Sequence, residues 1–76
     1  MKKIGKVYEL KPVTGNDSKD ILKQELGKEG YYLMDRYIFK NGENGQRMGV
    51  LNGHRNNWFV SVWNKKLEKI LDDLDF

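Results

Sequence analysis

His54 and Arg55 are adjacent in a polar stretch of the sequence, and together they could carry out acid–base chemistry on a phosphate. A histidine titrates near neutral pH and can serve as a general base, while a neighbouring arginine can bind a phosphodiester. A metal-free ribonuclease needs this pairing, so RNA cleavage through His54 is one hypothesis for the function. Because a lone histidine in a polar turn is most often an ordinary surface residue, we expect a non-enzymatic protein.

Other catalytic and cofactor chemistry has few candidate residues. The 76-residue chain has one histidine and no cysteine, which leaves too few ligands for a structural zinc site and removes thiol nucleophiles and disulfides. The acidic residues Asp72, Asp73 and Asp75 lack the spacing and the glycine of a calcium loop. No glycine-rich stretch is followed by the Lys-Ser/Thr of a phosphate loop. The sequence therefore implies neither a metal nor a cofactor.

A second kind of chemistry is macromolecular binding by aromatic and basic side chains. Aromatic rings can stack on unpaired bases while cations meet phosphates, but the same residue types are also favoured in protein–protein hot spots. Alternatively, the aromatic side chains could complete a core on both sides of a short sheet, and the basic side chains could simply be solvated. These three interpretations stay open, and a protein partner is preferred over RNA or single-stranded DNA. The candidate binding residues are Tyr32, Arg36, Lys40, Arg47, Arg55, Phe59 and Trp63.

The charge of the chain gives only weak support to nucleic-acid binding. Lysine and arginine number 14 against 11 acidic residues, a formal net charge of +3 with a pI near 9.2. A dedicated duplex-binding protein neutralises many phosphates. Cations and acids are interspersed here, so we expect weak binding unless folding gathers the cations. The positive balance also argues against an acidic mimic of nucleic acid.

Two segments are predicted to be helices. Candidate N-caps at 16–18 precede apolar residues at helical spacing, and Gly30 suits a left-handed position after the helix, which predicts a helix over 18–28. After a second candidate cap, Asn64, apolar residues recur at i, i+3, i+4 and i+7 among charged ones. This stripe predicts a C-terminal amphipathic helix. Its members are Leu67, Ile70, Leu71 and Leu74.

Four segments are predicted to be strands from alternation or from dense aromatic and branched residues, with turns where Asn and Gly gather. The predicted strands are residues 6–10, 31–40, 46–51 and 58–63, and the predicted turns are 41–45 and 52–57. The predicted fold is a single two-layer α+β domain over 1–76. It consists of a short N-terminal strand, a helix, a three-stranded antiparallel meander and a C-terminal helix. Both helices must cover one face of the sheet to form one core.

Side chains alternate along a strand, so the two faces of the sheet can be sorted. The more apolar set is assigned to the core: Tyr31, Leu33, Asp35, Tyr37 and Phe39, then Met48 and Val50, then Trp58, Val60 and Val62. The opposite face would carry the candidate residues Tyr32, Arg36, Lys40, Arg47, Phe59 and Trp63, with Arg55 at its rim. Asp35 does not fit a core position, which would require a bulge to turn it outward.

The order of the predicted elements resembles that of small messenger-RNA-cleaving toxins built on the double-stranded-RNA-binding fold. This order is a helix, then Gly30-Tyr31-Tyr32, then a meander ending in Leu67-Glu-Lys-Ile-Leu71. The resemblance covers roughly residues 18–76 and is limited to the order of elements. The Gly-Ser-His of that family's first strand is absent, and this chain has Arg36-Tyr37-Ile38 in that region. No catalytic residue of the family can therefore be carried over.

The leading functional hypothesis is an accessory or regulatory protein that binds a macromolecule on the open face of its sheet. Eleven lysines against three arginines, with seven asparagines, are typical of AT-rich genomes. With the small size, this composition suggests a phage or mobile-element modulator, such as an inhibitor, of a host complex. No apolar run reaches the length of a signal peptide or a membrane span, which predicts a cytoplasmic protein. Trp58 or Trp63 on an edge strand could also pair two chains into a homodimer.

Overall fold

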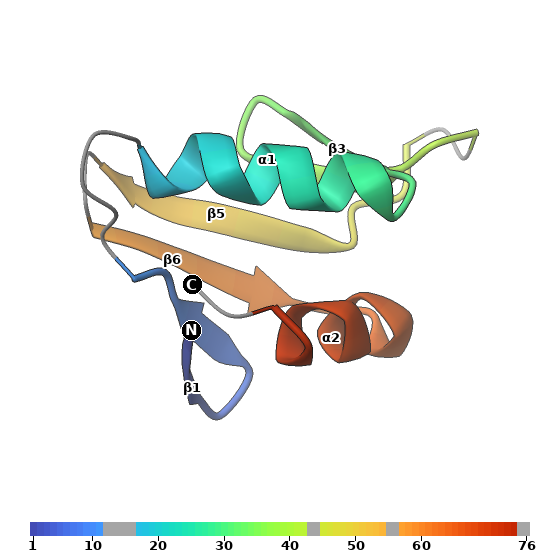
Figure 1. Ribbon diagram of the computed structural model, residues 1–76. Helices are drawn as coiled ribbons and strands as arrows, with labels where there is room; N and C mark the ends of the chain where they lie inside the picture. The colour runs from blue at the N-terminus through green and yellow to red at the C-terminus, as the bar shows by residue number, and fades with distance from the viewer. Residues whose placement is uncertain (12–16, 43–44, 55–56, 75–76) are drawn as a thin grey trace.

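The computed structural model describes residues 1–11, 17–42, 45–54 and 57–74, which form one six-stranded antiparallel sheet and two helices (Figure 1). The elements are β1 (Lys2–Ile4), β2 (Val7–Glu9), α1 (Ser18–Lys28), β3 (Tyr31–Met34), β4 (Tyr37–Lys40), β5 (Gly49–His54), β6 (Asn57–Val62) and α2 (Lys65–Asp72). The strands lie in the order β1-β2-β6-β5-β4-β3. The predicted α+β class is confirmed.

Local capping sets the limits of α1, as predicted. Asp17 is the N-cap, and its Oδ1 accepts hydrogen bonds from the Lys19 amide at 2.9 Å and from Trp58 Nε1 at 2.7 Å. The second bond ties the start of the helix to β6. Gly30 follows the helix with φ of +86°, a left-handed conformation that costs a glycine little.

The apolar stripe of α2 is buried as its spacing predicts. The Asn64 side chain caps this helix by accepting a hydrogen bond from the Leu67 amide at 3.1 Å. Leu67 and Leu71 are fully buried, while Ile70 and Leu74 pack at the edge of the core. Most of the stabilisation of this eight-residue helix must therefore come from packing, because isolated helices this short are marginal.

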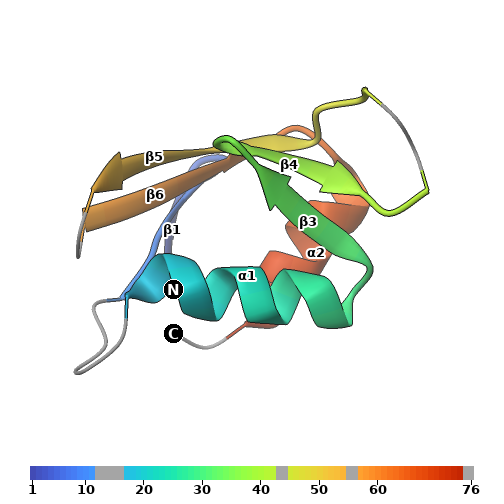
Figure 2. The ribbon, with the colours of Figure 1, turned by 90° about the horizontal axis from the view of Figure 1, so that it is seen from above.

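Both helices cover the same face of the sheet, and the sheet curves around them (Figure 2). The core between the two layers joins buried residues of both helices to buried residues of the inner strands. These residues include Leu22 and Leu26 of α1, Leu67 and Leu71 of α2, and Tyr8, Ile38, Leu51, Val60 and Val62 of the sheet. The other face, which we call the open face, carries no helix formed by the described residues.

The single strand predicted over 31–40 is wrong, because the chain turns back at residues 35 and 36 to form the hairpin β3–β4. Asp35 has φ of +61°, a conformation that the short polar side chain of aspartate tolerates. Its misfit in the predicted core is thus explained by a turn, not by a bulge. The turn also places Leu33 and Ile38 opposite each other on the helix-covered face.

Because of this hairpin, several residues lie on the opposite face of the sheet from the one predicted. Tyr37 and Phe39, which were assigned to the core face, lie on the open face with Tyr32 and Met34. Lys40 pairs with Tyr31 and lies on the helix-covered side, not on the open face as predicted.

The return strand is displaced by three residues from the predicted 46–51, to Gly49–His54. The predicted turn at Asn52-Gly53 is wrong, since Gly53 pairs with Trp58 inside the ladder. This shift buries Leu51 against the helices and places Val50 on the open face, the reverse of the predicted assignment. Met48, which precedes the strand, is buried as expected.

The strands β2 and β6 agree more closely with the strands predicted from the sequence. Residues 7–9 form β2 within the predicted strand 6–10. The strand β1 before it, joined through Gly5 with φ of +63°, was missed because its residues Lys2–Ile4 are all exposed and show no apolar alternation. In β6, the side predicted for Trp58, Val60 and Val62 is confirmed. Residues 43 and 44 of the predicted turn 41–45, and residues 55 and 56 of the predicted turn 52–57, lie outside the described residues.

Candidate functional site

A row of side chains crosses the open face from one edge of the sheet to the other. The cross-strand register places six residues in this row, one on each strand, and we call it the apolar row. In the order of the strands, it consists of Ile4, Val7, Ser61, Val50, Tyr37 and Met34. Ile4 is 63% exposed and Met34 is 58% exposed, so both ends of the row are open to solvent.

Aromatic side chains flank the apolar row on both sides. Phe59, 37% exposed, lies in the neighbouring register row, and Trp63, 57% exposed, directly follows β6. The rings of Tyr32 and Phe39 stack with centroids 5.5 Å apart. Phe39 is buried although it lies on the helix-free side and outside the main core cluster. The open face therefore has a packed aromatic cluster of its own.

Two arginines lie over one member of the row. The Cζ atom of Arg47 is 4.0 Å from the centroid of the Tyr37 ring, and that of Arg36 is 5.7 Å from the same centroid. Both are cation–π contacts. Both arginines are exposed, and neither forms an ion pair with an acidic residue in the part of the chain that the structure describes.

The structure brings most of the predicted binding residues to one face. Tyr32, Arg36, Arg47, Phe59 and Trp63 lie on or beside the open face. Lys40 does not, and Arg55 lies outside the described residues. Sequence reasoning missed Ile4, Val7, Met34 and Tyr37 as members of this surface. An alternating pattern read across the hidden turn at Asp35 assigned Tyr37 to the wrong side.

Lys40 lines a groove on the other side of the molecule, between α2 and the adjoining ends of α1, β3 and β4. The groove has a volume of about 610 Å³. Its walls carry three lysines and two acids together with Tyr31, Ile70 and Leu74. Because charges of both signs are mixed there, the lining favours no one class of ligand.

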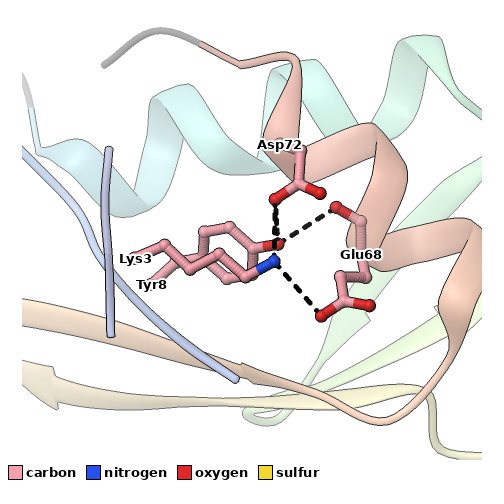
Figure 3. Close-up of polar contacts among 4 residues, drawn as sticks. All are labelled: Lys3, Tyr8, Glu68 and Asp72. Atoms are coloured by element: carbon pink, nitrogen blue, oxygen red, sulfur yellow. Dashed lines mark hydrogen bonds and ion pairs between the residues drawn. The ribbon is translucent and has the colours of Figure 1, made fainter. Parts of the chain in front are cut away.

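A polar network fastens the N-terminal hairpin to α2 (Figure 3). The Tyr8 hydroxyl lies 2.5 Å from Asp72 Oδ1, to which it donates, and 3.1 Å from the backbone oxygen of Glu68. Lys3 Nζ lies 3.1 Å from Asp72 Oδ1 and 3.3 Å from Glu68 Oε2. The same ammonium group lies 5.2 Å from the centroid of the Tyr8 ring.

The electrostatics of this network are those of a structural contact. Burial, followed by the bond to Asp72, raises the pKa of Tyr8. Hydrogen bonds from Tyr8 and Lys3 lower the pKa of Asp72, and bonds to Tyr8 and Asp72 raise the pKa of Lys3. Neither Tyr8 nor Lys3 is thus poised to lose a proton near neutral pH, as a general base must be.

The lowered pKa of Asp72 predicts a loss of stability in acid. The unfolded chain takes up the proton of this carboxyl at a higher pH than the native protein does, near its ordinary pKa of about 4. The network's contribution is thus complete above that pH and is lost as the pH falls. We expect Asp72→Asn to lower the urea midpoint at pH 7 and to reduce its dependence on pH between 7 and 3.

The matched control for this measurement is Asp73→Asn. Asp73, which directly follows Asp72, is exposed and forms no side-chain hydrogen bond with another described residue. An equal effect of both substitutions would show that general charge, and not the network, sets the acid sensitivity.

Candidate metal and membrane features are absent from the part of the chain that the structure covers. No group of three or more His, Asp or Glu side chains there could hold a metal ion. No described helix has the length and apolar character needed to cross a membrane. The His54 side chain and Arg55 lie outside the described part, so the ribonuclease hypothesis stays a prediction.

Comparison of the chain with family models, with curated proteins and with solved structures gives no significant match. The resemblance in element order to messenger-RNA-cleaving toxins is supported by none of these comparisons.

Proposed function

We propose that this protein is a non-enzymatic accessory or regulatory protein that binds another protein through the open face of its sheet. The observation that carries the proposal is the apolar row, which extends across all six strands with large side chains exposed at its ends. Ser61 interrupts the row between Val7 and Val50, but the other five members are apolar or aromatic. Exposed apolar side chains gathered on one face of a small domain indicate an interaction site, because leaving them in water is costly. Aromatic residues and arginine beside it are typical hot-spot residues.

The distribution of positive charge favours protein over nucleic acid. Six of the 14 basic residues lie on α1 and α2, on the opposite side of the sheet, and Lys40 lines the groove there. On the open face, Arg36 and Arg47 lie together at the Tyr37 ring, whereas the inner strands β2 and β5 present the aliphatic side chains of Val7 and Val50. A nucleic-acid site needs cations along the path of the phosphates, and these aliphatic groups would leave phosphates unpaired.

The shape of the sheet favours a partner other than a second copy of the chain. The open face is the convex side of the curved sheet (Figure 2). Two convex faces would touch only near their centres, and stable interfaces need close complementarity over about 800 Å² on each partner. A partner with a concave surface, or one that folds around the sheet, fits better. Binding of that kind would let a small protein modulate, for example inhibit, a larger complex.

The experiment is capture of partners from a lysate of the source cell, with and without nuclease, by the wild-type protein and by the double variant Ile4→Asp/Met34→Asp. Both residues are largely exposed, so the folded state should tolerate the change. We expect nuclease-resistant protein partners to bind the wild type and to be lost, by about tenfold or more, with the variant.

The matched control places two acids on the helix side, as Lys23→Asp/Gln24→Asp on the exposed surface of α1. This variant should retain the partners. Recovery of nucleic acid alone, with a steep loss between low and moderate salt, would contradict the proposal and favour RNA or single-stranded DNA binding.

A further inference from the structure

The Tyr37 ring holds two positive charges close together on the open face. Its contacts with Arg47 at 4.0 Å and Arg36 at 5.7 Å place the two guanidinium groups within about 10 Å of each other. The arginines come from different segments, one from the β3–β4 turn and the other from the stretch before β5. The fold, and not the local sequence, brings them together.

No acidic side chain neutralises this pair in the described protein. The ion pairs among the described residues are formed by Lys3 and Lys28, and exposed Asp35, the neighbour of Arg36, is not a partner in one. Neither positive charge has a carboxylate partner among the described residues, so an anion that approaches the Tyr37 ring would be attracted by both arginines. The planar guanidinium group is well suited to paired hydrogen bonds with a carboxylate.

The neighbours of this pair indicate where such an anion would come from. Tyr37 belongs to the apolar row, with Met34 beside it on β3 and Val50 beside it on β5. An anion bound to the arginines would therefore lie next to aliphatic side chains. That combination matches an acidic residue set among apolar residues on a protein surface better than it matches a phosphate backbone.

We propose that Arg36, Tyr37 and Arg47 form a carboxylate clamp that binds an Asp or Glu side chain of the protein docked on the open face. This inference rests on the proposed function and adds the chemistry of the partner. The partner must present at least one acidic side chain beside an apolar patch. The rest of the apolar row supplies the contact area, and the clamp fixes the register of the partner on the sheet.

The test is an NMR titration of the whole protein with hexaglutamate at constant ionic strength. We expect saturable shifts of the Nε–H signals of both arginines and of the Tyr37 ring. The double variant Arg36→Gln/Arg47→Gln should weaken binding about fivefold or more, since two exposed ion pairs contribute about 1 kcal/mol together. Arg36→Lys/Arg47→Lys keeps the charge without the planar group and should bind with intermediate strength.

The control removes the same charge elsewhere, as Lys23→Gln/Lys65→Gln on the exposed surfaces of the helices, and should bind like the wild type. Equal weakening by both glutamine pairs, or no saturable shift at the arginines, would overturn the clamp. Tighter binding of hexathymidylate with the same shifts would assign the arginines to a nucleic-acid phosphate instead. Partner capture lost with Ile4→Asp/Met34→Asp but unaffected by Arg36→Gln/Arg47→Gln would remove the clamp and leave the docking face intact.

Discussion

Replacing Gly53 by alanine is expected to remove a large part of the stability of the protein. Gly53 has φ of +119°, which L-residues rarely adopt, and a Cβ atom there would overlap the backbone oxygen of Asn57 on the paired strand. Backbone atoms of a ladder cannot move aside without breaking the pairing. We expect a loss above about 4 kcal/mol, against a total of about 4–11 kcal/mol for a domain of this size.

Urea denaturation followed by tryptophan fluorescence measures this loss, because Trp58 pairs with Gly53 and packs against the core. Gly42→Ala is the matched control. Gly42 also has a positive φ, +82°, but open space surrounds the position of its Cβ atom. Its substitution should cost about 1 kcal/mol from backbone strain alone. Similar losses in both variants would show that the close approach to Asn57 is unimportant.

Replacing Leu67 by alanine is expected to lower the free energy of unfolding by about 2–5 kcal/mol. Leu67 is fully buried, and with Ile38 it occupies the space above Gly49, where a Cβ atom would lie 3.7 Å from one of its methyl groups. The strand has no side chain there to fill the cavity.

Urea midpoints of Leu67→Ala and of Lys66→Ala, the exposed neighbouring position on α2, test this prediction. Lys66→Ala should change the stability by less than about 0.5 kcal/mol. A loss below about 1 kcal/mol for Leu67→Ala would show that α2 adjusts its position freely. In that case the sheet would not depend on this helix for its core.

Both helices could be predicted from the sequence because their signals are local. Asp17 and Asn64 cap the helices through bonds to amides two or three residues away, and Gly30 ends α1 by its own conformation. The apolar stripe of α2 predicts a helix whichever apolar surface it packs against. The one-sided, two-layer arrangement followed from the same local facts, since two helices and one sheet can bury only one face of the sheet.

The strands between 31 and 54 could be predicted only in part because their limits depend on partners distant in sequence. The pattern of residues 31–40 fits a single strand and a hairpin equally well, and Asp35-Arg36 is not a strong turn dipeptide. Asn52-Gly53 is a strong one, yet pairing with β6 and burial of Leu51 keep it within a strand. Since side chains alternate, each such shift moves residues to the opposite face.

The sequence by itself thus determined the fold class, the two helices and a helix-free sheet surface bearing Tyr32, Arg36, Arg47, Phe59 and Trp63. Only the tertiary structure decided that the apolar row crosses this surface, that Lys40 lies on the other side, and that two arginines share the Tyr37 ring. Helix signals depend on neighbours within a few residues. The composition of a sheet face depends on register, which strands acquire only when they pair.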